Sequence, residues 1–357
     1  MEQYRLELRG INKQFTGVQA LVDAGFSLKR GEVHALLGIN GAGKSTLIKI
    51  ISGVYSKDSG DIVLDGKPAA INNPQEALDL GISTVFQDPQ IVDSFTGYEN
   101  IYLGVENGVR FELSPISRKK LRQKAQKLLE EYPLDIDIDK KGSDLNNIER
   151  EILALLRALS KKCDILILDE PTSILTEKEK HILFTCVREL KNRGVSVIYI
   201  THHLGEIGEI CDAYTIYRNG RGAATEEIKN SRVDIEHIAE LMIGKRLSQF
   251  YPEKTKAPGE VVFSCRSLCL AERLFNIAFE SRKGEILGIF GLVGSGIDEL
   301  SKILYGAMDY DGGEMTLRGK ALRLPDTGSA LRRGIYLVPG NRKTEGQIGN
   351  LSIAENL

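Results

Sequence analysis

The sequence has no excess of positive charge, and this absence argues against a nucleic-acid partner. It contains 47 lysines and arginines against 49 aspartates and glutamates, which gives a formal net charge of −2. Proteins that bind nucleic-acid phosphates usually carry a basic excess. Hydrophobic residues make up 42% of the chain and charged residues 27%, a balance that is ordinary for a globular protein with a packed core.

Cysteines and long apolar runs are also scarce. The five cysteines, at positions 163, 186, 211, 265 and 269, are an odd number without a CxxC pair, which favours reduced thiols over disulfides or metal ligands. No run of 18 apolar residues occurs, and the first residues lack the basic-then-apolar order of a signal peptide. We therefore expect a protein that stays in the cytosol, and its 357 residues predict roughly two domains.

A phosphate loop is the most specific motif in the chain. Residues 38–46 contain the complete pattern Gly-x-x-x-x-Gly-Lys-Ser/Thr, after an apolar strand candidate at 33–37 and before a helical stretch at 47–52. Glycines allow a tight turn with inward N–H groups, and the new helix presents its positive end to phosphate. The expected nucleotide-binding positions are Gly38, Asn40, Gly41, Ala42, Gly43, Lys44, Ser45 and Thr46. The alternative, a glycine turn that merely caps a helix, is disfavoured because every fixed position of the motif is present.

The remaining pattern is that of an α/β protein. The first part contains short strand candidates, a hairpin-like segment and amphipathic helices before and after a second apolar strand. The expected strands are 4–8, 19–27, 32–37, 81–88, 164–170 and 195–201, the hairpin is 58–67, and the expected helices are 118–131, 148–160 and 177–192.

Two carboxylates end the apolar strand candidate at 164–170. Such a run is typical of a parallel strand buried on both faces whose end opens on an active site. Asp169 is placed to hold Mg²⁺ together with the Ser45 hydroxyl, while Glu170 can polarise an attacking water. Lys44 is expected to reach the β- and γ-phosphates of a nucleotide.

Three further residues have two interpretations each when they are considered alone. Gln87 ends a strand candidate and can face either a ligand or solvent. His202 follows another strand and is a candidate sensor of the γ-phosphate, although a core or surface histidine is commoner. Phe15 precedes a glycine turn and, taken alone, is better explained as a core residue.

The chain also repeats itself. Residues 284–296 restate 31–43 at an offset of 253 residues, the separation of Gly38 and Gly291, and the same offset relates Gly66 to Gly319. This pattern predicts a duplicated domain. In the second copy the three positions that matter most are changed. Ile297 replaces Lys44, Asp298 replaces Ser45 and Gly340 replaces Gln87. An isoleucine cannot neutralise phosphate and a carboxylate repels it, so we expect no hydrolysis there.

Taken in order, these motifs resemble the ATP-binding-cassette (ABC) ATPases. They match the family's A-loop, Walker A, Q-loop, Walker B with catalytic glutamate, D-loop and H-switch, at Phe15, Gly38–Thr46, Gln87, Ile165–Glu170, Ser173–Thr176 and His202. The resemblance implies ATP and Mg²⁺ as ligands and catalytic roles for Lys44, Glu170 and His202. It also implies adenine stacking on Phe15 and metal sensing by Gln87 in addition to Ser45 and Asp169.

The same resemblance implies a fold and a domain plan. The expected fold is an α/β cassette with a mixed sheet core, an antiparallel β subdomain and a helical subdomain, duplicated with an incomplete second copy. The expected domains are a first cassette at 1–245, a polar linker with two prolines at 246–259 and part of a degenerate second cassette at 260–357.

The chain resembles the ribose/galactose-type monosaccharide importers, because it has two cassettes and the phosphate loop of the second cassette is degenerate. The chain departs from them at Gly340-Asn341, where that family usually has Glu-Asp. It also departs at the signature, which here is Leu145–Glu149. The bulk of Ile148 and the charge of Glu149 predict weak clasping of phosphate or none. In the head-to-tail cassette dimer that the resemblance implies, this defect falls on the same composite site as the decayed second loop.

Expected partners follow from the resemblance. They are transmembrane permease subunits and, indirectly, an extracytoplasmic sugar-binding protein, which places the chain at the cytoplasmic face of the cell membrane. Nucleosides or a sugar-like signalling molecule are alternative cargoes. A soluble twin-cassette ATPase acting on ribosomes or DNA, and a nucleotide-binding module that does not hydrolyse, are alternative functions.

Overall fold

The chain forms two compact units, Met1–Tyr251 and Pro252–Leu357. A computed structural model describes residues 4–87, 89–103, 117–132, 134, 136–173, 175–229, 232–246, 259–292, 294–340 and 345–357. The linker expected at 246–259 lies outside the described residues, apart from its first and last positions.

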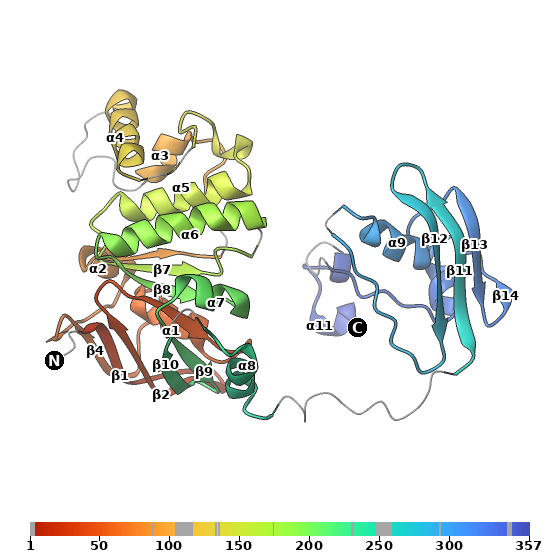
Figure 1. Cartoon of the computed structure of the whole chain (residues 1–357), viewed down its shortest axis with the longest axis horizontal. Coiled ribbons are helices and arrows are strands. Elements are labelled where there is room, and N and C mark those ends of the chain that lie inside the picture. Colours follow the sequence, from red (N-terminus) through yellow and green to blue (C-terminus); the bar gives the residue numbers. More distant parts are fainter. Residues whose placement is uncertain are drawn as a thin grey trace. The chain divides into compact units, whose positions relative to one another are not determined.

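The first unit begins with an antiparallel sheet in the order β2-β1-β4-β5 (Figure 1). Its strands are β1 (Tyr4–Phe15), β2 (Val18–Lys29), β4 (Ser59–Leu64) and β5 (Lys67–Pro68). β1 runs seven residues beyond the expected end at Leu8 because it pairs with β2 as far as the turn at Gly17, through several register shifts. Apolar side chains of this sheet pack on helix α1 (Lys44–Ile51).

The second sheet of the first unit forms its core, and the candidate site residues follow the ends of its strands. Its order is β10-β9-β3-β8-β7-β6, with β9 to β6 parallel and β10 antiparallel to β9. The strands are β3 (Val33–Leu37), β6 (Ile82–Val85), β7 (Ile165–Asp169), β8 (Ser196–Ile200), β9 (Ala213–Arg218) and β10 (Arg221–Glu227). The first four residues of β7 are all buried. This explains the continuous apolar run, since a parallel sheet is covered on both faces.

Alternate residues of these strands enter different cores. Ile165 and Ile167 of β7 pack with α1 and the antiparallel sheet, whereas Leu166 and Leu168 pack with helices on the opposite face. Besides α1, the described helices of the unit are α2 (Pro74–Asp79), α3 (Gly97–Ile101), α4 (Arg118–Glu131), α5 (Asn147–Leu159), α6 (Glu177–Asn192), α7 (Leu204–Ile210) and α8 (Ile235–Ile243), with a 3-10 turn at Gly142–Asp144. Figure 1 shows α3 and α4 beyond α5 and α6, as the separate helical part of the unit. The expected cassette architecture is confirmed in these three parts.

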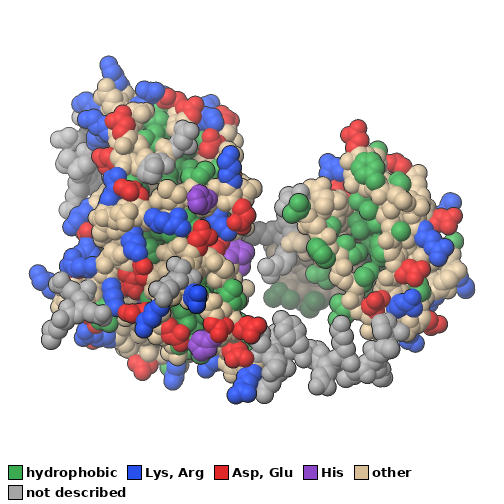
Figure 2. All heavy atoms as spheres, in the orientation of Figure 1, with side chains coloured by type: hydrophobic (Ala, Val, Ile, Leu, Met, Phe, Trp, Pro, Cys, Tyr) green, Lys and Arg blue, Asp and Glu red, His purple; other side chains and the backbone are tan. Residues whose placement is uncertain are grey.

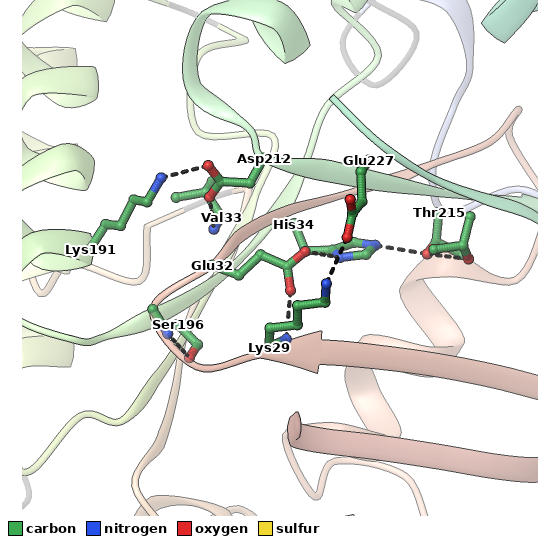
Figure 3. Close-up of polar contacts among 11 residues, drawn as sticks. Lys29, Glu32, Val33, His34, Lys191, Ser196, Asp212, Thr215 and Glu227 are labelled. Atoms are coloured by element: carbon green, nitrogen blue, oxygen red, sulfur yellow. Dashed lines mark hydrogen bonds and ion pairs between the residues drawn. The ribbon is translucent and has the colours of Figure 1, made fainter. Parts of the chain in front are cut away.

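A buried polar network fixes the amino end of β3 (Figure 3). His34 is only 2% exposed, and its ring lies 3.1 Å from Glu32 Oε1 through Nδ1 and 2.7 Å from Thr215 Oγ1 through Nε2. Beside it, the Val33 N–H donates to Asp212, which also pairs with Lys191 of α6 at 2.5 Å. Buried polar groups are normally paired in this way, so the network secures the turn that leads from β2 into β3.

The second unit repeats the antiparallel part of the first. Its sheet order β12-β11-β13-β14 matches β2-β1-β4-β5. Backbone conformations recur at the sequence offset as well. Asp23 and Asn276 have φ of 47° and 52°, and Asp65 and Arg318 have φ of 49° and 51°. The elements are β11 (Val261–Leu270), β12 (Leu274–Arg282), β13 (Gly312–Leu317) and β14 (Lys320–Ala321), with α9 (Ile297–Leu304), α10 (Thr327–Arg332) and α11 (Ile353–Asn356).

A parallel core sheet is not formed by the described residues of the second unit. The segment that corresponds to β3 is exposed there. Ile286 is 100% exposed and Phe290 96%, whereas their counterparts Val33 and Leu37 are fully buried. Apolar side chains are visible on the surface of this unit in Figure 2. The repeat is therefore structural in the antiparallel part and limited to sequence in the segment that corresponds to β3.

Candidate active site

The phosphate loop connects β3 to α1 as the sequence predicts. Two of its glycines are required by close backbone approach. A Cβ on Gly38 (φ 152°) would lie 2.4 Å from the Tyr217 carbonyl oxygen, and one on Gly43 (φ 103°) would lie 2.8 Å from the Ala20 carbonyl oxygen. The loop is thus pressed against β9 and β2, and it leads directly into the start of α1. Helix starts of this kind bind anions.

Lys44 lies over this loop. Its Nζ donates to the carbonyl oxygens of Gly38 at 2.6 Å and Ile39 at 3.3 Å. Burial lowers the pKa of Lys44, and the negative charges of Glu170 and Asp169 oppose this effect. A phosphate bound in the loop would supply the negative charge that favours the protonated amine.

Asp169 and Glu170 stand at the carboxyl end of β7. Burial raises the pKa of Asp169, the neighbouring charge of Glu170 raises it further, and Lys44 and Lys49 act in the opposite direction. Glu170 has a left-handed backbone conformation with φ of 52°, which is uncommon outside glycine and turns its side chain out of the strand's alternation. The two carboxylates attract a cation more strongly than an isolated surface acid does.

Gln87 and His202 both contact the same oxygen of Glu170. Gln87 Nε2 donates to Glu170 Oε2 at 2.8 Å. His202 Nδ1 lies 3.3 Å from that oxygen, and the histidine side chain is 55% exposed. The three residues come from the ends of β6, β7 and β8, which are neighbours in the sheet. The structure thus joins the candidate catalytic carboxylate of Glu170 to Gln87 and His202.

Gln87, Asp169 and Glu170 share a cavity of about 430 Å³ with the phosphate loop, whereas His202 lies outside its wall and lines another cavity with Thr172 and Glu206. Its wall consists of residues 18–20, 40–46, 87, 169, 170 and 200. Residues 18–20 and Ile200 were missed by sequence reasoning. They lie on β2 and at the end of β8, and only the close approach of those strands to the loop brings them here.

The oxygen groups in this cavity fit Mg²⁺. The ion prefers oxygen ligands and usually keeps several of its waters, so it needs few protein groups. Ser45, Gln87 and Asp169 supply a hydroxyl, an amide and a carboxylate within the same cavity. Clusters of three histidine, cysteine or acidic side chains that could hold a metal do not occur among the described residues.

Phe15 lies at the end of β1, outside the wall of this cavity. Its side chain is 37% exposed, its ring meets Tyr55 edge-on at 5.2 Å, and Lys13 Nζ lies 5.5 Å from its centroid. The aromatic surface is therefore accessible, as a stacking platform must be. Its role in binding adenine stays a prediction.

The segment expected to replace the family signature starts α5. Asn146 caps the helix by accepting from the Glu149 N–H at 2.9 Å, and the Glu149 carboxylate accepts from the Asn146 N–H at 2.8 Å. Lys140 Nζ adds a 2.8 Å contact to the same carboxylate. These side chains therefore use hydrogen-bonding groups at the helix start, and the weak clasping of phosphate stays a prediction.

The comparisons with known proteins agree with this geometry. The sequence profile of the ABC transporter family matches residues 21–173. The ribose import ATP-binding protein of Hahella chejuensis is 40% identical over 99% of this chain, and that of Clostridium tetani is 38% identical over 99%. The chain spans 70% and 69% of the lengths of these two relatives, and 66% of a putative ribose/galactose/methyl galactoside import ATP-binding protein from Burkholderia cenocepacia.

Solved structures show the same fold. An ATP-binding cassette of an ABC transporter in its ADP conformation is 27% identical, covers 68% of this chain and 99% of its own, and superposes with a TM-score of 0.60. A cassette from Clostridium perfringens, part of a transporter complex, is also 27% identical with a TM-score of 0.56 over 70% of this chain and 98% of its own. The chain therefore belongs to the ABC transporter family, as one of its ATPases.

Among the described residues, no helix is both long and apolar enough to cross a membrane.

Proposed function

We propose that the first unit binds Mg-ATP at this site and hydrolyses it to energise import of a monosaccharide. The observation that carries the proposal is the convergence of Gln87 and His202 on Glu170 beside the phosphate loop. A surface carboxylate has no need of two polar partners from neighbouring strands. A catalytic base must be oriented, and these contacts orient it.

Residues of this chain can serve each step of ATP binding and hydrolysis. The loop N–H groups and Lys44 bind the phosphates, and Lys44 exchanges its carbonyl contacts for phosphate oxygens. Glu170 accepts a hydrogen bond from the attacking water, and His202 holds Glu170 and faces the γ-phosphate. Ser45, Gln87 and Asp169 would hold Mg²⁺, which supplies charge neutralisation on the transferring phosphoryl group. Phe15 would stack on the adenine.

The cargo assignment rests on the names of the relatives. They are described as ribose or ribose/galactose import ATP-binding proteins. Because the ATPase of a transporter need not contact the cargo, a nucleoside or a sugar-like signalling molecule is the alternative cargo. A twin-cassette ATPase that acts on ribosomes or DNA is the alternative of a different class, and the net charge of −2 disfavours it.

Docking to permease subunits at the cytoplasmic face of the membrane is part of the proposal. An apolar cavity of about 290 Å³ lies beside Gln87, between the end of β6, α3 and α5. Phe86 and Leu103 at its rim are 36% and 39% exposed. An apolar segment of a permease that filled this cavity would contact the residues next to Gln87, and so would sense the nucleotide site.

The second unit, at 260–357, is proposed to be a degenerate copy of the first cassette at 1–245, joined by a linker at 246–259. The shared sheet order and the repeated left-handed residues support this proposal. Ile297 and Asp298 stand where Lys44 and Ser45 do the chemistry. In a head-to-tail pair of cassettes, one composite site would thus lack both the lysine of the phosphate loop and a signature that contacts phosphate.

The test measures Mg-ATP binding and hydrolysis by the chain and by two variants. Lys44→Ala removes the phosphate-binding amine, so we expect binding to fall by at least about tenfold, as for a lost charged contact of roughly 1.5–3 kcal/mol. Glu170→Gln keeps binding and loses turnover. Lys67→Ala, which removes an exposed lysine from β5, is the matched control and should behave as the parent chain. Retained tight binding in Lys44→Ala would refute the loop assignment.

A longer polypeptide provides the second half of this test. The relatives extend beyond the region matched by this chain. If the chain binds Mg-ATP but turns over only when extended by the corresponding residues of a relative, a clasp from the second cassette is needed. Full turnover without the extension would show that the first unit needs no clasp from a second cassette to hydrolyse ATP.

A further inference from the structure

Behind the catalytic carboxylate lies a buried cluster that none of the known motifs includes. Glu206 of α7 is 5% exposed, and its Oε2 accepts hydrogen bonds from three hydroxyl groups. The donors are Thr172 at 3.1 Å, Tyr199 at 2.9 Å and Thr201 at 3.0 Å. All three donors are themselves at most 5% exposed. One carboxylate oxygen therefore organises three buried hydroxyls.

Two of these donors belong to the segments that carry the site. Thr172 is two residues after Glu170, and Thr201 immediately precedes His202. The third donor, Tyr199, lies inside β8. Glu206 is thus the common anchor of the chain leaving β7 and the chain leaving β8. These two segments carry Glu170 and His202, whose side chains lie 3.3 Å apart.

Further hydrogen bonds connect Glu206 to the turn that contains His202. The Thr201 hydroxyl, which donates to Glu206, accepts from the His203 N–H at 2.9 Å. The Glu206 N–H donates to the His203 carbonyl oxygen at 3.0 Å. The turn that contains His202 is therefore held on both sides. On the other segment, the Ser173 N–H donates to the Glu170 carbonyl oxygen at 3.2 Å and closes the turn after β7.

We propose that Glu206 is a positioning residue for hydrolysis, holding Glu170 and His202 in register through Thr172 and Thr201. The inference rests on the proposed function of this site and deepens it. Hydrogen bonds to an ionised carboxylate are stronger than neutral ones, and a buried carboxylate that loses a donor is costly. The left-handed conformation of Glu170 (φ 52°) needs such support from its surroundings, because it is not an intrinsically favoured conformation.

A purely structural role for Glu206 predicts a different pattern from a positioning role. If Glu206 only attached α7 to the sheet, its three donors would be equivalent. If it positions the site, only the donors next to Glu170 and His202 matter for turnover. Thr172→Val and Tyr199→Phe form a matched pair, since each removes one hydroxyl donor to the same oxygen, but Tyr199 lies inside β8 and not in the turns that follow β7 and β8.

The experiment compares kcat, KM for Mg-ATP and the denaturant midpoint of the two variants. We expect comparable losses of stability. We expect Thr172→Val to lower kcat about 10- to 100-fold at a nearly constant KM, the size of effect that a small misplacement of catalytic groups produces. Tyr199→Phe should stay within about twofold in kcat. Thr172→Ser, which keeps the hydroxyl, should restore turnover, and Glu206→Gln should lower kcat in the same way as Thr172→Val.

A second readout does not depend on turnover. The ring ¹H and ¹⁵N chemical shifts of His202 should change in Thr172→Val and stay unchanged in Tyr199→Phe. The His202→Gln variant identifies these signals among those of the five histidines. Equal kcat losses and equal shift changes in the two variants would overturn the inference. Absence of Mg-ATP hydrolysis above the level of Lys44→Ala in both the parent chain and its extended form would count against the proposed function instead, and the His202 shifts would still decide the role of Glu206.

Discussion

Glu151 is a carboxyl group on the buried side of α5. It is 4% exposed, and burial raises its pKa from 4.5 to about 7. The folded chain therefore keeps a proton on this group at a pH where the unfolded chain has lost it. A shift of this size corresponds to about 3 kcal/mol of unfolding free energy. Glu151 plays no part in the proposed site, yet it makes the stability of the first unit depend on pH.

The sign of that dependence gives a prediction. Below pH 4.5 both states carry the proton. Between pH 4.5 and about 7 the unfolded state releases its proton first, so stability falls as pH rises, and above pH 7 the full loss remains. Glu151→Gln should therefore match the parent chain near pH 4.5 and exceed it by up to about 3 kcal/mol at pH 8 in urea unfolding. Glu130→Gln, at an exposed site on α4, is the control. An equal effect of Glu151→Gln at both pH values would contradict this account.

At the scale of an element, the start of α5 shows how a helix end can be withdrawn from ligand binding. A helix start exposes unpaired N–H groups that would bind a phosphate. Here the Asn146 and Glu149 side chains satisfy two of these groups reciprocally. Burial raises the pKa of Glu149, but the bonds from Lys140 and from the Asn146 N–H outweigh it, so the net pKa is lowered. The carboxylate is thus held in its charged form at the start of α5.

Removing the cap should destabilise the helix without affecting the nucleotide site. Asn146→Ala is expected to lower the unfolding free energy of the first unit by about 1 kcal/mol, as loss of an N-cap usually does. Asn146→Ser retains a capping oxygen and should recover most of it. Thermal unfolding with and without Mg-ATP measures both effects. Loss of Mg-ATP binding in Asn146→Ala would mean that this segment does contact nucleotide within the same chain.

At the scale of the molecule, the two units differ in what they can bind. The first has a phosphate loop with Lys44 and a cavity beside it, whereas the second has Ile297 and Asp298 at the equivalent start of α9. The backbone conformation is kept at the glycine before each helix, since Gly43 and Gly296 have φ of 103° and 88°. Nucleotide binding should therefore act on one unit only.

Calorimetry can test this asymmetry. Mg-ATP at about 100 times its dissociation constant stabilises the folded state by about 2.7 kcal/mol. For a unit of about 250 residues this raises the unfolding temperature by roughly 5–10 °C. We expect one transition to shift and that of the second unit to stay. At the same Mg-ATP concentration, Lys44→Ala, which binds at least about tenfold more weakly, should reduce the shift to about half or less. Movement of both transitions would show that the second unit also binds nucleotide, or that the two units unfold together.

The sequence determined the parts of the site that lie within a few residues of one another. Gly38–Thr46 and Asp169-Glu170 were found because their chemistry needs a fixed local spacing, and an apolar strand before each set their context. The repeat was found in the same way, from residues compared at a constant offset. The antiparallel strands were underestimated, as for β1 beyond Leu8, because pairing with β2 and β4 sustains a strand whose own pattern is irregular.

Only the tertiary structure decided which strand ends are neighbours. The order β3-β8-β7-β6 brings Gln87, Glu170 and His202 to one point, although 115 residues separate the first from the last. The same folding joins Glu206 to Thr172 and closes the start of α5 with Lys140. Local spacing cannot encode such contacts, because they depend on which elements pack together, and that is set by the burial of both sheet faces in the whole unit.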